Sequence, residues 1–253
     1  MPKKMSLGFV VAIPSYDRPQ QLRKKTLSML AENRIPPHAI TVFVANNTQR
    51  ELYASEIGDA YKIVVGRKGM VNIRNAITMH YPPHTRILNV DDDVTYIGKG
   101  EASGERMTRT KNLVQLAKEG FALCKHHGYI LWGLHPSTNR RSLKSAQTVS
   151  TDLKYIAGAL FGIINDKALR VTLDHAEDYE RCIKVFSKYG GMIRFNRYTA
   201  MTTYYAKGGL ESTGRTVTKE ESDKKELARR YPALATTYVR PGGRTEVRLL
   251  KAP

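Results

Sequence analysis

The chain has 253 residues, of which 41% are hydrophobic, and its formal net charge is +18. The longest apolar run, residues 156–164, is far shorter than the roughly 20 residues of a membrane span, so no membrane segment is expected. The excess of Lys and Arg predicts a polyanionic partner, with nucleic acid ahead of an acidic membrane surface because no basic amphipathic helix with a broad apolar face is evident. A generally basic enzyme without such a partner stays open.

The length suits one large α/β domain better than two small ones. Cys124 and Cys182 are far apart and form no CxxC motif, which predicts reduced core thiols in a cytoplasmic protein. No apolar stretch typical of a signal peptide follows the start of the sequence. We therefore expect a cytoplasmic location, which would be the host cytoplasm if a phage encodes the protein.

In the first half, apolar runs predict strands at residues 7–13, 40–45, 61–65 and 87–90. Helical spacing predicts a helix that ends near Asn33 and another that carries Ile73, Ala76 and Ile77 on one face. Alternation of strands and helices indicates a mostly parallel central sheet covered by helices.

In the second half, strands are expected at residues 129–133, 156–164, 198–206 and 244–250. Helices are expected at 113–124, after Asp178, and up to Arg230, where Thr218 and Glu221 would form a capping box. Residues 98–109 and 136–147 are expected to form flexible loops. No internal repeat or linker is visible, so residues 1–253 are predicted to be a single domain, with a basic C-terminal segment at about 216–253 that adds mainly charge.

Three consecutive carboxylates, Asp91, Asp92 and Asp93, follow the predicted strand at 87–90. In open α/β sheets, ligands bind at the carboxyl ends of the strands. Adjacent acids repel one another unless a cation neutralises them, and carboxylates suit hard cations such as Mg²⁺ and Mn²⁺. The run therefore predicts a divalent-metal site, although a solvated acidic turn would have the same composition.

Polar segments at 14–18, 68–75 and 91–93 fall at strand ends on one side of the predicted sheet. This order resembles the GT-A glycosyltransferases, in which a DxD motif binds the metal and the two other segments lie beside the nucleotide sugar. The resemblance implies a Rossmann-like fold, Mn²⁺ or Mg²⁺, a UDP-sugar donor, and Asp91 and Asp93 as metal ligands. The implied nucleotide-sugar site comprises Pro14, Ser15, Tyr16, Arg18, Asn46, Lys68, Arg74, Asn75, Asp91, Asp92, Gly158, Lys207 and Arg215.

A second acidic pair, Glu177 and Asp178, begins a predicted helix and resembles the pair that supplies the catalytic base of inverting members. An acceptor hydroxyl must lose its proton as it attacks the anomeric carbon, and Asp178 is the better candidate for that base. Glu177 lies four residues before Arg181, so a helical ion pair would also explain it. Asp178 would equally suit the positive end of the helix dipole.

Within the GT-A group, the chain resembles the small DNA glycosyltransferases of phages and the kinetoplastid base J glucosyltransferase. The resemblance covers roughly residues 7–215 and rests on segments 12–18, 89–93, 158–162, 177–178 and 207–210. It implies transfer of a sugar, usually glucose from UDP-glucose, to 5-hydroxymethylcytosine or 5-hydroxymethyluracil in DNA. Many GT-A enzymes have a late His as third metal ligand, but none follows His175 here. Either water would complete the coordination of the metal, or Lys207 or Arg215 would neutralise the diphosphate directly.

Six residues are candidates for contacting the DNA acceptor: Trp132, His135, Arg140, Arg141, Lys144 and His175. The three basic ones would contact phosphates, although a solvated loop explains them too. Trp132 could stack on a base or sit in the core, and either histidine could be an ordinary polar residue. Two rival functions stay open: a GT-A enzyme acting on an anionic glycan or lipid-linked acceptor, and a non-catalytic DNA-binding module on the same fold.

Overall fold

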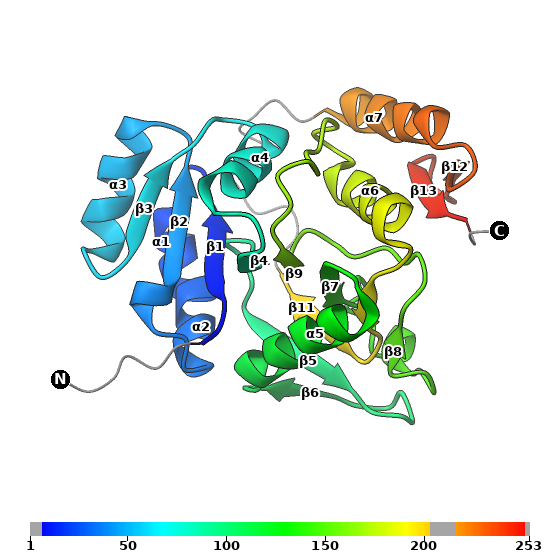
Figure 1. Cartoon of the computed structure of the whole chain (residues 1–253), viewed down its shortest axis with the longest axis horizontal. Coiled ribbons are helices and arrows are strands. Elements are labelled where there is room, and N and C mark those ends of the chain that lie inside the picture. The colour runs from blue at the N-terminus through cyan, green and yellow to red at the C-terminus, as the bar shows by residue number, and fades with distance from the viewer. Residues whose placement is uncertain (1–6, 203–215, 251–253) are drawn as a thin grey trace.

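A computed structural model describes residues 7–202 and 216–250 of the chain. Its centre is an eight-stranded sheet with the order β3-β2-β1-β4-β9-β7-β10-β8 (Figure 1). These strands are β1 (Val10–Pro14), β2 (Ile40–Val44), β3 (Lys62–Val65), β4 (Arg86–Val90), β7 (Leu131–Leu134), β8 (Val149–Ser150), β9 (Leu160–Ile164) and β10 (Ile193–Phe195). Strands β3, β2, β1 and β4 are parallel, whereas β9 runs antiparallel to both β4 and β7. The predicted sheet of mostly parallel strands is confirmed.

Helices cover both faces of this sheet (Figure 1). They are α1 (Pro19–Leu22), α2 (Ser28–Glu32), α3 (Asn47–Ile57), α4 (Met70–His80), α5 (Leu113–His127), α6 (Glu177–Tyr189) and α7 (Val217–Arg230), with a π-helical turn η1 (Arg23–Leu27) joining α1 to α2 and short 3₁₀ turns η2 (Pro37–Ala39) and η3 (Arg140–Leu143). Side chains alternate along β1, so that Val11 packs with α1–α3 and α5, while Ala12 packs with α4. Helix α6 packs on the same sheet face as α4, farther along the sheet.

Two smaller sheets flank the central one. Strands β11 (Tyr198–Met201), β5 (Tyr96–Gly100) and β6 (Met107–Thr110) form one of them. The flexible loop predicted at 98–109 is therefore wrong, because most of it is a hairpin whose Gly98 leaves room for the side chain of Met107. Strands β12 (Ala235–Val239) and β13 (Thr245–Leu249) form the other sheet, which packs with α7 against α6.

The C-terminal segment is thus a folded layer and not only a source of charge. Its apolar core joins Leu227 of α7, Ala235 of β12 and Val247 of β13 to Ile183 of α6. Helix α7 begins two residues earlier than the expected capping box, since Thr216 accepts a hydrogen bond from the backbone N–H of Lys219. The predicted cap at 218 and 221 is corrected accordingly.

Candidate functional site

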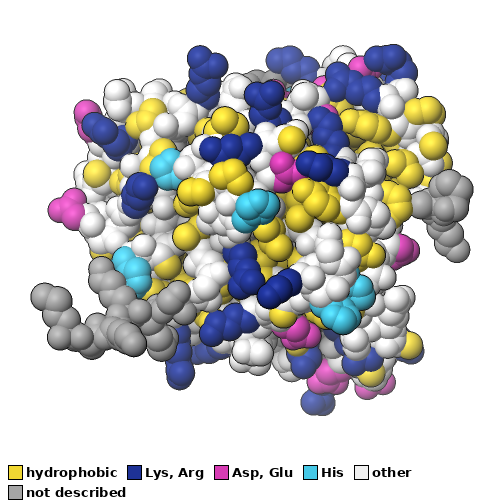
Figure 2. Space-filling view, viewed as in Figure 1, with side chains coloured by type: hydrophobic (Ala, Val, Ile, Leu, Met, Phe, Trp, Pro, Cys, Tyr) yellow, Lys and Arg dark blue, Asp and Glu magenta, His cyan; other side chains and the backbone are white. Residues whose placement is uncertain are grey.

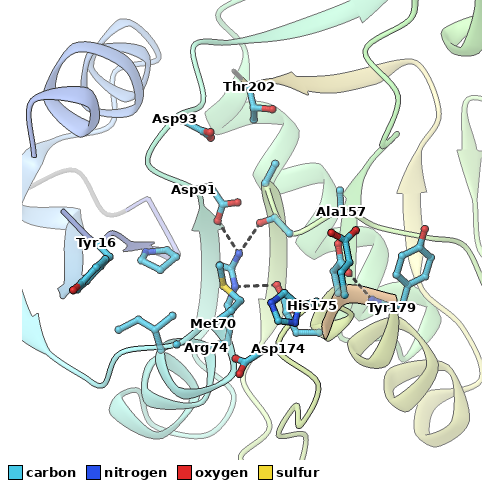
Figure 3. Close-up of a pocket in the computed structure, with 18 of the residues that line it drawn as sticks. Tyr16, Met70, Arg74, Asp91, Asp93, Ala157, Asp174, His175, Tyr179 and Thr202 are labelled. Carbon is cyan, nitrogen blue, oxygen red and sulfur yellow. Dashed lines mark hydrogen bonds and ion pairs between the residues drawn. The ribbon is translucent and has the colours of Figure 1, made fainter. Parts of the chain in front are cut away.

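A cleft of about 610 Å³ opens at the carboxyl ends of β1 and β4 and extends to α6, α7 and β13 (Figure 3). The polar segments that the sequence placed at strand ends all contribute to it. Ten of the residues predicted for the nucleotide sugar and the metal line this cleft, including all three of the acidic run: Pro14, Ser15, Tyr16, Arg18, Lys68, Arg74, Asp91, Asp92, Asp93 and Gly158. Glu177, Asp178 and His175 line it as well, so the acidic run at 91–93 and the acidic pair at 177–178 border the same cleft.

Asp92, the middle carboxylate of the run, is buried beneath the turn that follows β1. The side chain of Arg18 forms an ion pair with it at 2.5 Å, and the Ser15 hydroxyl donates to its other oxygen at 2.5 Å. Tyr53 of α3 joins the cluster through its hydroxyl, 2.6 Å from Ser15 Oγ. Burial raises the pKa of Asp92 to about 7, although Arg18 and Ser15 oppose that rise. Asp92 therefore anchors the 14–18 turn, and both its oxygens are engaged by protein.

Asp91 and Asp93 present their carboxylates to the cleft on either side of Asp92 (Figure 3). Burial and the neighbouring charge of Asp91 raise the pKa of Asp93 to about 6, as expected for two close carboxylates without a cation. The hydroxyl of Thr26 holds this stretch by donating to the backbone carbonyl of Asp91 at 2.7 Å and accepting from Val94 N–H at 3.0 Å.

The two acids fit a hard divalent cation. Within residues 7–202 and 216–250, no group of three His, Cys, Asp or Glu side chains could enclose a metal ion by itself. Mg²⁺ in nucleotide enzymes is commonly held by one or two carboxylates, with waters and substrate phosphates completing the shell. Asp91 and Asp93 supply that number of carboxylates, and their mutual repulsion favours a cation between them.

Arg74 of α4 links the acidic run to the start of α6 (Figure 3). Its Nη2 donates to Asp91 at 2.7 Å and to the carbonyl of Gly158 at 3.1 Å, while its Nε is 3.3 Å from Glu177. The other oxygen of Glu177 accepts from Arg181 at 2.6 Å. The guanidinium of Arg181 in turn lies 3.7 Å from the ring centre of Phe161. Glu177 is therefore the middle of a buried Arg–Glu–Arg triad, which matches the helical ion pair that the sequence offered as the alternative explanation of this residue.

Asp178 is the next residue and lines the cleft. Its Oδ2 accepts from the hydroxyl of Tyr155 at 2.6 Å, and its Oδ1 accepts from the N–H of Tyr179 at 2.9 Å. The rings of Tyr155 and Tyr179 stack with centres 4.0 Å apart. Burial, together with the charge of Glu177, raises the pKa of Asp178, while Arg181 and Tyr155 oppose the rise. A carboxyl with a raised pKa in a cleft is suited to proton transfer near neutral pH.

Cationic side chains gather where α4 begins. Arg67 and Lys68 are exposed at the cleft, and Lys68 Nζ lies 4.9 Å from the ring centre of Tyr16. The carboxylate of Asp174 accepts from Val71 N–H at 2.8 Å and so caps the first turn of α4 from 103 residues away in the sequence. These groups form the side of the cleft where an anionic ligand would be favoured.

The C-terminal layer supplies lining residues that sequence reasoning missed. They are Thr216, Val217, Glu220, Glu221, Lys224, Arg244, Thr245 and Glu246. His175 is tied to this layer, since its Nδ1 lies 2.9 Å from Asp223 of α7. Because this segment is basic overall, its composition gave no sign that its acidic residues would line the cleft.

Several predicted residues lie elsewhere. Trp132 is fully buried against Phe121 and Phe195, so its predicted contact with an acceptor is wrong. Asn46 and Asn75 do not belong to the described cleft lining. Asn46 caps α3 through Gln49 N–H, and Asn75 pairs with the backbone of Val171; both side chains therefore serve the scaffold.

The remaining acceptor candidates lie away from the cleft in the described structure. His135 accepts from Ser137 N–H at 3.1 Å, and the exposed residues Arg140, Arg141 and Lys144 lie on or beside η3. Their DNA contacts stay predictions. Lys207 and Arg215, proposed from the sequence for the donor phosphates, lie outside the described residues.

No protein-family profile matches the sequence, and no curated protein matches it significantly. Solved structures do match. A mannosyltransferase from Pyrobaculum calidifontis in complex with GDP-Man and Mn²⁺ aligns with a TM-score of 0.55 at 13% identity over 88% of this chain. This chain spans 64% of that protein's length. Glucosyl-3-phosphoglycerate synthase from Mycobacterium tuberculosis, with Mn²⁺, UDP and glucosyl-3-phosphoglycerate, aligns over 100% of this chain and 94% of its own, with a TM-score of 0.52 at 10% identity.

None of the helices in the described part of the chain is both long and apolar enough to cross a membrane.

Identities this low establish a shared fold and nothing finer. The order of strands, the acidic run after β4 and the similarity to these two transferases lead to one conclusion about architecture: the chain has the GT-A fold of nucleotide-sugar transferases.

Proposed function

We propose that this chain is a metal-dependent glycosyltransferase that uses a nucleotide-diphospho-sugar donor. One observation carries the proposal: Asp91 and Asp93, which suit a metal, and Asp178, which suits a base, line the same cleft. If the carboxylates at 91 and 93 lay on the opposite face of the molecule from Asp178, one substrate could not contact both the metal and the base. The two similar structures, which contain Mn²⁺ with GDP-Man or with UDP, support the same donor class.

Asp91 and Asp93 would hold Mn²⁺ or Mg²⁺, which when bound would neutralise charge on the leaving diphosphate. Arg67 and Lys68 would contact the same phosphates from the start of α4. The turn at 14–18 would hold the nucleoside, since Asp92 fixes it through Arg18 and Ser15. Arg74 would keep Asp91 in place beside the sugar.

Asp178 would act as the general base. As the acceptor oxygen forms its bond to the anomeric carbon, the hydroxyl proton passes to the Asp178 carboxylate, and the bond from that carbon to the diphosphate oxygen breaks. Attack opposite the leaving group inverts the anomeric centre, as the resemblance implies. Tyr155, which donates to Oδ2, would orient the carboxylate for this step.

For the acceptor, we propose DNA carrying 5-hydroxymethylcytosine or 5-hydroxymethyluracil. The net charge of +18 supports a polyanionic acceptor, because Lys and Arg provide most of the affinity of proteins for DNA. Lys and Arg side chains are spread over the face in Figure 2, whereas Asp and Glu are few near its centre. The exposed cations at 140, 141 and 144 would contact phosphates outside the cleft.

The test offers UDP-glucose, GDP-mannose and other nucleotide sugars in parallel, with Mn²⁺, to hydroxymethylated or unmodified DNA. Mass spectrometry of the digested nucleosides detects a hexose added to the hydroxymethyl base. Asp93→Asn and Asp178→Asn serve as inactive controls that retain DNA binding. Sugar transfer only to a glycan or a small acceptor would exclude DNA. Full biological function of both variants would instead favour a non-catalytic DNA-binding module.

A further inference from the structure

The cleft is divided electrostatically into two halves. The half beside β1, β4 and α4 contains, among the described residues, four cations, Arg18, Arg67, Lys68 and Arg74, against five carboxylates, Asp91, Asp92, Asp93, Asp174 and Glu177. A divalent cation would make this half net positive. The half beyond Asp178 contains, within residues 7–202 and 216–250, more carboxylates than cations: Asp178, Glu220, Glu221 and Glu246 against Lys224 and Arg244.

The buried cation of the second half is already neutralised by protein. Lys224 lies 2.9 Å from Glu220 and 3.5 Å from Glu246, and its ammonium also donates to the carbonyl of Thr245 at 2.8 Å. A small acceptor with a phosphate or carboxylate would have to displace these contacts or contact Arg244 at the exposed edge, and in both cases would approach surplus negative charge. Burying such an anion without a partner is costly.

The same half contains an aromatic surface next to the proposed base. Tyr155 and Tyr179 both line the cleft and stack on each other. The hydroxyl of Tyr155 and the backbone N–H of Tyr179 both donate to Asp178. Aromatic side chains beside hydroxyl-recognising carboxylates suit a ring, whether a nucleobase or a sugar, since either can pack its face on them.

From the charge division and the aromatic pair, we infer that the reacting part of the acceptor is an uncharged ring that packs against Tyr179, with any phosphates of the acceptor kept outside the cleft. This inference rests on the proposed transferase function and narrows its substrate class. For a DNA acceptor it means that the hydroxymethyl base leaves the stack and enters the cleft, as in other enzymes that modify bases. It excludes phosphoglyceric acid, which is bound in other structures of the glucosyl-3-phosphoglycerate synthase from Mycobacterium tuberculosis, as a good acceptor here.

The first test compares acceptors. With one active donor and Mn²⁺, kcat/KM is measured for a hydroxymethylated oligonucleotide, for methyl hexosides, and for phosphoglyceric acid. We expect kcat/KM for at least one uncharged-ring acceptor to exceed that for phosphoglyceric acid by roughly tenfold or more. The free-energy cost of burying one unpaired charge is larger than the free energy that corresponds to a tenfold ratio. Preference for phosphoglyceric acid would overturn the inference.

The second test changes the aromatic surface. Tyr179→Leu is expected to raise the KM for the acceptor by roughly tenfold, the scale of lost stacking, with a much smaller change in the KM for the donor. Tyr179→Phe keeps the ring and should keep most of the acceptor affinity. Tyr189→Leu, at the far end of α6 and outside the described cleft lining, is the matched control for general destabilisation. Equal changes in both KM values for Tyr179→Leu would show a merely structural role and overturn the inference.

The third test separates this inference from the proposed function. Calorimetry measures binding of UDP and GDP in the presence of Mn²⁺. Absence of nucleotide binding would overturn the transferase proposal together with the inference. Nucleotide binding with transfer only to anionic small acceptors would overturn the inference and the DNA acceptor, while the proposed nucleotide-sugar transferase activity would stand.

Discussion

Glu177 offers the sharpest test of how the site is held together. Removing its charge should lower the free energy of unfolding more than removing the charge of Asp178. Both oxygens of Glu177 accept from buried arginines, Arg74 at 3.3 Å and Arg181 at 2.6 Å. Arg74 keeps a second carboxylate, Asp91, but Glu177 is the ion-pair partner of Arg181 in the described structure, where Nε and Nη2 of Arg181 have no hydrogen-bond partner. The substitution Glu177→Gln therefore leaves the buried guanidinium of Arg181 without its ion-pair partner.

Breaking a buried ion pair from one side costs about 3–5 kcal/mol. For a chain of this size that corresponds to a fall in Tm of about 10 °C. Urea denaturation of Glu177→Gln, Arg181→Met and the double variant measures it. We expect the double variant to be more stable than Glu177→Gln alone, because Met removes the orphaned charge and can still pack on Phe161. A cost below about 1 kcal/mol for Glu177→Gln, or a double variant no more stable than it, would refute the reasoning.

Three further predictions concern the cleft. Asp178→Asn should lower kcat by roughly 10²- to 10⁴-fold while UDP binding persists, as measured by single-turnover kinetics and calorimetry. In the unaltered enzyme, kcat/KM for the acceptor should rise with pH through a midpoint above the ordinary Asp value of about 4, because burial raises the pKa of Asp178 in the free enzyme and the base must be ionised; a profile flat down to pH 4 would contradict this. Gly158→Ala should cost roughly 1–3 kcal/mol of stability by urea denaturation, since its Cβ would lie 3.0 Å from both Arg74 Nη2 and Glu177 Oε1.

The parallel half of the sheet could be predicted from sequence because β1, β2, β3 and β4 are short apolar runs with polar ends. Helix α3 was missed for a physical reason. Its buried positions are Gln49, Tyr53 and Ile57, a stripe with only one aliphatic residue, and its N-cap Asn46 comes two residues after the end of β2. Weak amphipathicity and a local cap cannot by themselves distinguish a helix from a loop.

The acidic run could be located from sequence, but the division of labour within it could not. Three identical side chains differ here only in what lies around them: Asp92 is buried under Arg18, while Asp91 and Asp93 face the cleft. Trp132 shows the same limit, since its burial depends on Phe121 and Phe195, which come from distant elements. Contacts between distant segments decided both cases.

The hairpin of β12 and β13 pairs only with itself among the described strands, yet its residues 244–246 reach the cleft. Its backbone thus forms no strand pairing with the central sheet, whose strand β4 precedes the carboxylates at 91 and 93, although its side chains pack against α6, the helix that carries Asp178. Substitutions at this hairpin could redirect substrate choice while the reaction machinery stays intact. For protein engineers, it is a separable unit for retargeting, and truncating the chain there would remove a wall of the cavity instead of a dispensable tail.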